Sequence, residues 1–338
     1  MLAFVIIRHQ ADADAIARHV DAHRAYLAEL YHREKLVASG PFTARNGGAL
    51  ILDVRDEAEA AQLLAGEPYA VAGVATHEIR AWSPNRGALA NRRPLEGKVA
   101  IVTGASSGIG NAVALALARC GASIALAARR HDKLEALASR IRDAGHTATA
   151  FALDLADEGQ PHALVENVVR QHGRIDIVVN NAGIMLLSPI AEATGSDWRR
   201  MIELNLISLM ELSRAALPHV RATQGHVVNI ASLAGRIANP NASGYAASKF
   251  GVVGFSESLR REVFSDGVRV TVIEPGVVAT ELGEHIEHAG MKAGLRTRLA
   301  QMAPLTADDV ARAVVYAVTQ PPHVNVNEIV VRPTGQER

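Results

Sequence analysis

Short apolar runs that alternate with amphipathic stretches are the feature that most constrains the fold of this chain. The runs are largely β-branched or aliphatic, which is typical of strands buried on both faces of a parallel sheet. They lie at Val99 to Thr103, Ser123 to Ala127, Thr149 to Leu153, Ile175 to Asn180, Gly225 to Ala231, Arg269 to Glu274 and Asn327 to Val331. The pattern predicts an α/β fold with a doubly wound, Rossmann-type parallel sheet.

The N-terminal part of the chain has a different order of elements. We predict strands at Ala3 to Ile7, Ala49 to Val54 and Val74 to Trp82, helices at Asp12 to Leu36 and Glu57 to Leu64, and a further short strand near Val37. This order indicates a small α+β ferredoxin-like domain of the dimeric α/β-barrel type, with its helices on one sheet face. The other face would be bare, so we expect it to pair with a second copy.

A polar segment with two prolines, Ser83 to Glu96, separates these patterns and is predicted to be a linker. The chain has 338 residues, which is long for a single core. We therefore predict a ferredoxin-like domain at 1–82, a linker at 83–96 and a Rossmann domain at 97–338.

Charge and cysteine content exclude several classes of protein. Acidic and basic residues cancel, and basic residues do not cluster, so we expect no nucleic-acid or membrane partner. The single cysteine, Cys120, cannot form an internal disulfide, and no oxidising compartment is implied. Arg8 and His9 interrupt the first apolar run before it reaches the length of a signal-peptide core. We expect a cytoplasmic protein.

A glycine-rich turn follows the strand expected at Val99 to Thr103 and precedes a helix. Its glycines permit a sharp turn and let backbone N–H groups approach a pyrophosphate at the positive end of the helix. The spacing Gly-x-x-x-Gly-x-Gly differs from the commoner dinucleotide fingerprint, and the alternative is a purely structural turn. The residues expected to contact a dinucleotide here are Gly104, Ser106, Ser107, Gly108, Ile109 and Gly110.

The end of the second strand of this domain indicates which cofactor is used. An acidic residue at this position would bind the ribose hydroxyls of NAD, but the chain has Arg129 and Arg130. Since a guanidinium suits a 2′-phosphate, we predict NADP(H), with Arg129 as the main contact, Arg130 beside it and Ser106 as a helper. The alternative is that both arginines face solvent at a helix start.

Tyr245 and Lys249 are four residues apart, which places them on one helix face. A tyrosine normally titrates near pH ~10, and a neighbouring ammonium favours its phenolate. Ser232 follows a strand at the edge where open α/β sheets bind ligands. We expect Ser232 to hold a substrate oxygen while Tyr245 moves a proton and a nicotinamide exchanges hydride. Singly, each residue could be surface packing or a helix cap.

With these residues, the sequence resembles the short-chain dehydrogenase/reductase family over essentially all of residues 95 to 334. The matching elements are Thr103-Gly-Ala-Ser-Ser-Gly-Ile-Gly110, Asp154-Leu155, Asn180-Asn181-Ala182-Gly183, Asn205, Ser232, Tyr245-x-x-x-Lys249 and Pro275-Gly276-Val277 with Thr280. The resemblance implies that Asp154 and Leu155 flank the adenine, and that Asn181, Ala182 and Gly183 steady the cofactor. Pro275, Gly276, Val277 and Thr280 would lie against the nicotinamide carboxamide and phosphates.

The same resemblance implies that Asn205 holds a water on a proton relay through Lys249. It also implies a homo-oligomer, a dimer or tetramer, built through the helices that bear Asn205 and Tyr245. The chain end, Val326 to Thr334, resembles a subgroup with clavaldehyde reductases and β-hydroxy-acid dehydrogenases. That favours an aldehyde, or a small secondary alcohol or ketone, as substrate.

Residues that follow the motifs are expected to line an apolar substrate cleft. The predicted contacts are Met185, Leu233 and Arg236, and the region from Thr280 to Met302 is expected to be a mobile lid. Arg236 would pair with a substrate carboxylate, or else face solvent.

The first 82 residues resemble a YciI-like domain. The matching points are His23, Ser39-Gly40-Pro41, Glu67-Pro68-Tyr69, Ala72-Gly73-Val74 and Trp82. The family has a His/Asp pair, and the position where we expect the acid carries His32. His19 and His23 have a spacing that zinc ligands can have, but without a third ligand we expect exposed helix histidines and no metal.

We therefore expect an NADP(H)-dependent oxidoreductase that interconverts an alcohol and an aldehyde or ketone. Its first domain would be an assembly or accessory module. Two alternatives stay open: a bifunctional protein with a hydrolase or isomerase activity in the first domain, and a non-catalytic NADP-binding sensor.

Overall fold

The computed structural model describes residues 1–33, 35–85, 87, 89 and 93–336. Two compact units are present, Met1–Arg92 and Arg93–Arg338. The linker predicted at 83–96 includes residues 86, 88 and 90–92, which lie outside the described residues. Leu95, at the end of that predicted linker, is buried in the core of the second unit, and its amide donates to the Cys120 carbonyl.

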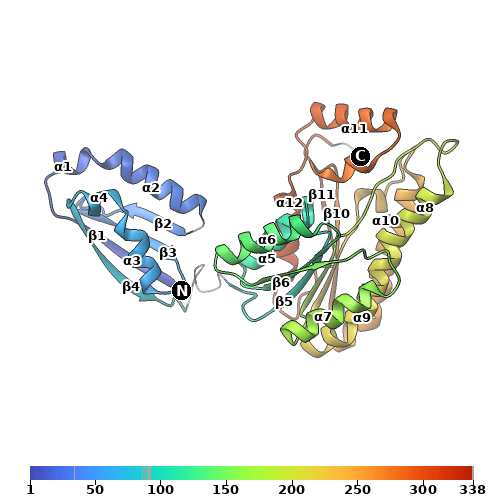
Figure 1. Ribbon diagram of the computed structural model, residues 1–338, viewed down its shortest axis with the longest axis horizontal. Coiled ribbons are helices and arrows are strands. Elements are labelled where there is room, and N and C mark those ends of the chain that lie inside the picture. The colour runs from blue at the N-terminus through green and yellow to red at the C-terminus, as the bar shows by residue number, and fades with distance from the viewer. Residues whose placement is uncertain (34, 86, 88, 90–92, 337–338) are drawn as a thin grey trace. The chain divides into compact units, whose positions relative to one another are not determined.

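The first unit is a four-stranded antiparallel sheet with the order β2-β3-β1-β4 (Figure 1). Its elements are β1 (Leu2–His9), α1 (Ala13–Ala17), α2 (Val20–His32), β2 (Leu36–Pro41), β3 (Gly47–Asp53), α3 (Glu57–Ala65), α4 (Pro68–Val71) and β4 (Ala75–Trp82). This strand order is that of a split-βαβ fold and confirms the predicted fold class. Helices and sheet enclose a core that includes Val5, Leu30 and Leu52.

The helix predicted from Asp12 to Leu36 is broken into two and ends earlier. Asp12 caps α1, and the chain leaves helical geometry at His19 before α2 begins. Leu36 belongs to β2, where it pairs with Leu52 of β3 and packs against the core. Helical spacing could not reveal this, because an apolar residue that returns to the core from a strand fits the same period.

The second unit is a seven-stranded parallel sheet with the order β11-β10-β9-β8-β5-β6-β7. Its strands are β5 (Val99–Thr103), β6 (Ser123–Ala128), β7 (Ala148–Ala152), β8 (Ile177–Asn180), β9 (His226–Ile230), β10 (Arg269–Pro275) and β11 (Glu328–Val331). Its longer helices are α5 (Gly108–Arg119), α6 (His131–Asp143), α7 (Gln160–His172), α8 (Gly195–Ile202), α9 (Ser208–Thr223), α10 (Ser243–Val263), α11 (Ala289–Gln301) and α12 (Ala307–Val318). The doubly wound fold is confirmed.

Helices cover both faces of this sheet and bury two separate apolar cores. Val102 of β5 packs in the core shared with α5, α6 and α12, whereas its neighbour Ile101 packs in the core shared with α7, α9 and α10. Successive strand residues point to opposite faces, so a strand covered on both sides has to be apolar throughout. All five residues of β5 are buried.

The winding of the sheet reverses between β5 and β8. From β5 the chain proceeds outward through β6 and β7, then returns to β8 and proceeds the other way through β9, β10 and β11. At such a reversal the connections diverge and leave a crevice at the carboxyl ends of the strands. The glycine turn after β5, the Asn181 segment after β8, Ser232 after β9 and Pro275 at the end of β10 all meet at this edge.

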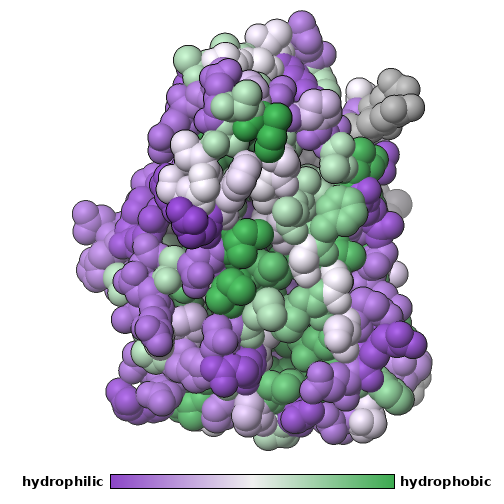
Figure 2. Space-filling model, turned by 90° about the vertical axis from the view of Figure 1, so that its right-hand side faces the viewer, coloured by the Kyte–Doolittle hydropathy of each residue, from purple (hydrophilic) through white to green (hydrophobic). Residues whose placement is uncertain are grey.

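A short 3₁₀ helix, η4 (Glu281–His285), and then α11 follow β10 and lie beyond this edge of the sheet (Figure 1). These elements belong to an excursion of the chain away from the sheet. Hydrogen bonds of 2.9 Å between Leu305 and the backbone at Val277 and Ala279 close the base of this excursion. Figure 2 shows a face on which apolar residues gather in the middle of a hydrophilic surround. No helix within the described part of the chain has the length and apolar character needed to cross a bilayer.

Candidate active site

The turn between β5 and α5 depends on glycine at three places. Gly104 and Gly108 have positive φ angles of 64° and 55°, which side-chain-bearing residues rarely adopt. A Cβ on Gly110 would lie 2.4 Å from the carbonyl oxygen of Gly104. The backbone of the turn is therefore folded back on the start of α5, as a phosphate-binding turn requires.

The start of α5 is open toward the crevice. Ser107 occupies the N-cap position but its side chain does not cap the helix, so the first N–H groups are available to an anion. The Thr103 hydroxyl accepts hydrogen bonds from the amides of Asn181 and Ala182, at 2.9 and 3.0 Å. The Asn181 side chain donates to the Thr103 carbonyl at 2.8 Å. The end of β8 is thereby fixed to the glycine turn.

A pocket of about 530 Å³ runs from this turn to the residues of α10. It is lined by nearly all of the predicted cofactor contacts, namely Gly104, Ser106, Ser107, Gly108, Ile109, Arg129, Arg130, Asp154, Leu155, Asn181, Ala182, Gly183, Tyr245, Lys249, Pro275, Gly276, Val277 and Thr280. Gly110 does not line it, because it packs beneath the turn against Gly104. A turn that only glycine can form, an open helix start and a continuous crevice fit a dinucleotide.

Tyr245, Lys249 and Ser232 meet at the other end of this pocket. Tyr245 and Lys249 are buried on one face of α10, and Ser232 hydrogen-bonds to the Tyr245 side chain. The Lys249 ammonium donates to the Ile230 carbonyl at 2.9 Å and lies 5.9 Å from the centre of the Tyr245 ring. The three residues predicted from their spacing are thus brought together.

Burial dominates the ionisation of the tyrosine and the lysine. It raises the pKa of Tyr245 above its usual 10, and the hydrogen bond with Ser232 lowers it only in part. Burial also lowers the pKa of Lys249 to about 8. We expected the ammonium to make the phenol easier to ionise. In this structure desolvation is the larger effect, so the phenol is protonated at neutral pH and able to donate its proton.

Asn205 lies behind the pocket, in a π-helical turn, η1 (Glu203–Ile207), that joins α8 to α9. Its side chain accepts from the Ile184 amide at 2.8 Å and donates to the Ile184 carbonyl at 2.9 Å. It also donates to the Ser248 hydroxyl at 3.0 Å. Gly183 separates it from Lys249, since a Cβ on Gly183 would lie 3.1 Å from Asn205 Oδ1 and 3.8 Å from Lys249 Nζ.

The two arginines after β6 both line the pocket but contact different groups. Arg130, and not Arg129, contacts the glycine turn: its guanidinium donates to the hydroxyls of Ser106 and Ser107, at 2.9 and 2.7 Å. Arg129 lies 3.5 Å from Asp154 and is more exposed. The sequence could not show which of the two arginines contacts the glycine turn, because the side chains of adjacent residues at a helix start point in different directions.

The predicted substrate contacts are only partly in the pocket. Met185 and Leu233 line it. Arg236 does not: it donates to Glu274, which is fully buried, at 2.7 Å, and also to Glu328. This corrects the expected pairing with a substrate carboxylate, because Arg236 already neutralises two carboxylates.

The region expected to be a lid forms one wall of the pocket. The additional lining residues of η4 and α11 are Glu281, Leu282, Gly283, His285, Met291, Gly294, Leu295, Arg298 and Leu299. Gln336, near the chain end, lines the pocket too, and its side chain accepts from the Val277 amide at 2.9 Å. No sequence pattern indicated Gln336, since its place depends on how the last segment folds back.

A second polar cluster lies in the first unit around Glu67. This carboxylate is fully buried. Its Oε1 lies 2.6 Å from Nδ1 of His23, and its Oε2 lies 3.1 Å from Nε2 of His77. Tyr69 stacks on His23, with ring centres 4.2 Å apart. His23 therefore has an acidic partner, but it is Glu67 and not a residue at position 32, and His23 is not the exposed helix histidine that we expected.

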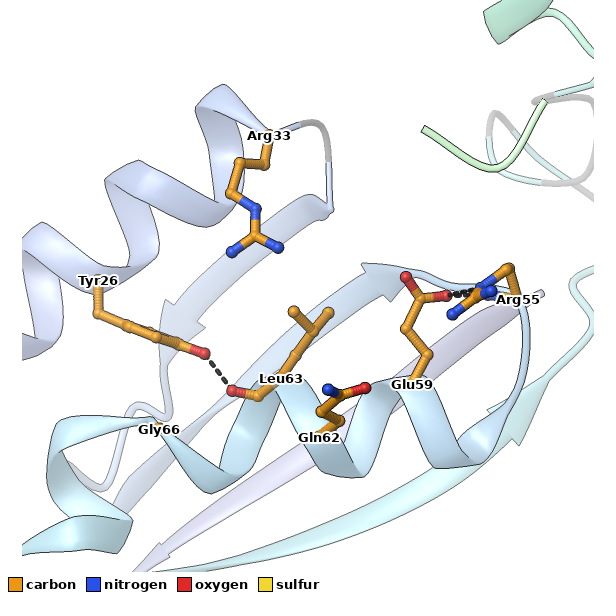
Figure 3. Close-up of a pocket in the computed structure, with 7 residues that line it drawn as sticks. All are labelled: Tyr26, Arg33, Arg55, Glu59, Gln62, Leu63 and Gly66. Carbon is orange, nitrogen blue, oxygen red and sulfur yellow. Dashed lines mark hydrogen bonds and ion pairs between the residues drawn. The ribbon is translucent and has the colours of Figure 1, made fainter. Parts of the chain in front are cut away.

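A separate pocket of about 410 Å³ in the first unit is lined by Tyr26, Arg33, Arg55, Glu59, Gln62, Leu63 and Gly66 (Figure 3). Tyr26 donates to the Leu63 carbonyl, and Arg55 donates to Glu59 at 3.1 Å. Glu59 is also paired with Lys35 at 2.8 Å, and Arg33 with Glu29 at 3.5 Å. Since these charges are matched within the chain, we assign the pocket no role.

Comparisons with known proteins agree with both units. Residues 98–290 match the family model described as short chain dehydrogenase, and residues 1–83 match the YCII-related domain. An uncharacterised oxidoreductase of Staphylococcus saprophyticus is 35% identical over 71% of this chain and 97% of its own length. The glycine betaine reductase of Emericella nidulans is 40% identical over 72% of this chain, but only 19% of that longer protein is covered.

Solved structures are similar to the same part of the chain. An alcohol dehydrogenase from the archaeon Thermococcus sibiricus, complexed with 5-hydroxy-NADP, superposes with a TM-score of 0.64 and 29% identity over 71% of this chain and 98% of its own. A metagenomic short-chain oxidoreductase in complex with NADP gives a TM-score of 0.61 and 34% identity over 71% and 99%.

Proposed function

Since the chain belongs to the short-chain dehydrogenase family, we propose that this oxidoreductase uses NADP(H) to interconvert an alcohol and an aldehyde or ketone. The observation that carries the proposal is that one pocket contains both the glycine turn and the Ser232, Tyr245 and Lys249 group. A nucleotide bound on the turn would extend toward this group, in which the hydroxyls of Ser232 and Tyr245 are the donors that a carbonyl oxygen needs.

The glycine turn and the start of α5 would bind the pyrophosphate, because the N–H groups at an uncapped helix start attract an anion. Asp154 and Leu155 flank the adenine, and Asn181 to Gly183 and Pro275 to Thr280 hold the nicotinamide half. When bound, the cofactor supplies or accepts the hydride. Lys249 reaches the ribose from a site where its ammonium is already fixed by Ile230.

In the reduction direction, the Ser232 hydroxyl and the Tyr245 phenol donate hydrogen bonds to the carbonyl oxygen and polarise it. The phenol then delivers its proton as the carbon receives hydride, and the raised pKa of Tyr245 favours this acid form. In oxidation, the phenolate removes the hydroxyl proton. Asn205 holds the Ile184 segment and, through a water, links Lys249 to solvent so that the proton is replaced.

Two features support NADP(H) over NAD(H). Arg129 and Arg130 stand where an NAD enzyme has a carboxylate, and Arg130 already contacts Ser106 in the glycine turn. The similar structures bound to NADP or 5-hydroxy-NADP add to this. Met185 and Leu233, with the wall formed by α11, favour a largely apolar carbonyl substrate.

Purified protein tested on a panel of aldehydes and ketones provides the decisive experiment. We expect NADPH to be oxidised faster than NADH with at least one member. Tyr245→Phe should lower turnover by about 10²-fold or more, while NADPH binding, followed by its fluorescence, is retained. Full turnover in this variant would refute the role of Tyr245, and NADPH binding without turnover on any carbonyl compound would favour a sensor.

The exposed apolar side chains of the second unit support a homo-oligomer. Trp198 of α8, Ile207 of η1 and Phe250 of α10 are each more than a third exposed, at 38%, 37% and 45%. We assign them to contacts between copies, because large exposed apolar groups on neighbouring elements favour association. Sedimentation of the wild-type chain and of Phe250→Lys tests this assignment, and a wild-type monomer would refute it.

The first unit supports a second candidate function, a separate catalytic site at His23. Its partner Glu67 is fully buried, whereas 15% of the His23 side chain is exposed. A solvent-accessible imidazole such as that of His23, oriented by a buried carboxylate such as that of Glu67, can act as a general base. In the Tyr245→Phe background, hydrolysis of any ester or thioester on a panel should be lost in His23→Ala. Activity that survives His23→Ala would remove this candidate, and His19→Ala is the matched control.

A further inference from the structure

Glu281 is an acidic residue in the wall of a pocket that is otherwise suited to a phosphate. It is the first residue of η4, and it lines the same pocket as Ser106, Ser107 and Arg130. One carboxylate oxygen lies 2.7 Å from Arg130 Nη1, and the other lies 2.9 Å from Lys133 Nζ. These hydrogen bonds lower the pKa of Glu281 to about 2, so the group is an anion at every pH of interest.

All three guanidinium nitrogens of Arg130 donate hydrogen bonds. Its Nε and Nη2 donate to Ser106 at 3.1 and 2.9 Å, its Nη2 also donates to Ser107, and its Nη1 donates to Glu281. A phosphate that reaches Arg130 beside Ser106 would meet a carboxylate already bound there. Two anions on one guanidinium repel each other, and the arriving group carries nearly twice the charge.

We propose that the Glu281 carboxylate occupies the Arg130 contact that the 2′-phosphate of the cofactor takes, and that this phosphate displaces it. The proposal rests on the proposed use of NADP(H). Glu281 is then a specificity-determining residue that weakens NADP(H) binding without touching a cofactor that lacks the phosphate. The pairs of Glu281 are displaceable because 48% of its side chain and 44% of that of Arg130 are exposed.

Displacement has a structural consequence for the lid. Glu281 lies two residues beyond Ala279, where the hydrogen bond with Leu305 closes the base of the excursion. Release of Glu281 therefore detaches η4 from Arg130 and Lys133, whereas the approach to α11 stays paired with Arg200 through Glu287 and with Glu192 through His288. The 2′-phosphate would loosen the wall that covers the substrate cleft, and a nucleotide without this phosphate would leave that wall tied to Arg130 and Lys133.

Binding of 2′,5′-ADP and of 5′-AMP, measured by calorimetry, tests this without turnover, because these ligands differ in the phosphate at the 2′ position. We expect Glu281→Gln to bind 2′,5′-ADP about 5-fold more tightly than the wild-type chain does, since an exposed ion pair of ordinary strength is removed. Binding of 5′-AMP should change less than about 2-fold. Glu284→Gln is the matched control: Glu284 lies in the same turn but pairs with Lys292 and Arg296 within the lid, and it should leave both affinities unchanged.

Equal or weaker binding of 2′,5′-ADP by Glu281→Gln, in a chain that prefers it to 5′-AMP, would overturn the inference and leave the proposed function standing. If neither the wild-type chain nor Glu281→Gln preferred 2′,5′-ADP, the proposed use of NADP(H) would itself be wrong. As a second readout, 2′,5′-ADP should increase hydrogen exchange of η4 in the wild-type chain, and 5′-AMP should not. Equal exchange with both ligands would contradict the displacement.

Discussion

Asn205 donates a hydrogen bond of 3.0 Å to the hydroxyl of Ser248, which in turn donates to the carbonyl of Tyr245 at 2.7 Å. This pair joins the π-helical turn of η1 to the turn of α10 that carries both Tyr245 and Lys249. Since Asn205, Ser248 and Tyr245 are all buried, these two bonds help to hold the turn of α10 that carries the tyrosine from outside the pocket. Removal of the Asn205 side chain should therefore affect both stability and activity.

Asn205→Ala should destabilise the chain by about 2–4 kcal/mol, because it leaves buried groups of Ile184 without partners. It should also lower kcat more than it changes KM, as α10 loses a contact next to Lys249. Chemical denaturation and steady-state kinetics measure the two effects. Asn167→Ala, at a half-buried position of α7 whose side chain bonds only with the exposed Arg170, is the control and should stay within about 0.5 kcal/mol of the wild-type chain. A loss as small as that of the control would contradict the assignment.

Arg130→Ala should raise KM for NADPH by about 10-fold or more and leave KM for NADH nearly unchanged, because a charge-assisted contact with the 2′-phosphate is lost. Arg129→Ala should have the smaller effect on NADPH, since Arg129 lies beside Asp154 and not beside Ser106. Kinetics with both cofactors and both variants distinguish the arginines. A larger effect of Arg129→Ala would restore our expectation from the sequence.

The buried lysine makes stability depend on pH above neutrality. Burial lowers the pKa of Lys249 to about 8 in the folded chain, below its usual 10.5, so between these values the unfolded chain binds more protons. The free energy of unfolding therefore rises with pH in this window, by up to about 3 kcal/mol. Lys249→Met should be more stable than the wild-type chain at pH 7, with an advantage that shrinks from pH 8 to 10. An advantage constant over that range would exclude the shifted pKa.

Acid should unfold the first unit by protonating Glu67. Burial alone would raise the pKa of Glu67, but hydrogen bonds from His23, His77 and the backbone at Tyr69 and Ala70 lower it well below its usual value. The ionised Glu67 adds to the free energy of unfolding above pH ~4.3, where an unfolded glutamate is also ionised, and this stabilisation is lost as the pH falls. Glu67→Gln should flatten the loss of stability below pH 5, as followed by near-UV circular dichroism, and an unchanged acid transition would contradict the assignment.

The sequence alone determined the second fold almost strand by strand. Strands such as β5 and β6 are apolar on both faces because helices cover both faces of the sheet, so their local composition reflects their burial. The same holds for the glycine turn, where the positive φ angles of Gly104 and Gly108 are requirements of the local backbone. The spacing of Tyr245 and Lys249 is likewise a property of one helix. These features were predictable because each is contained in a few consecutive residues.

Only the tertiary structure decided which charges meet. Arg130 reaches Glu281 across 151 positions of sequence, and His23 reaches Glu67 across 44. Arg236 is held by Glu274 and Glu328, and the early end of the helix predicted from Asp12 to Leu36 depends on how Leu36 returns to the core. An ionic partner leaves no periodic pattern, because any carboxylate at the right point in space satisfies a guanidinium. The local sequence therefore determines backbone conformation and burial, whereas the path of the whole chain determines which side chains pair.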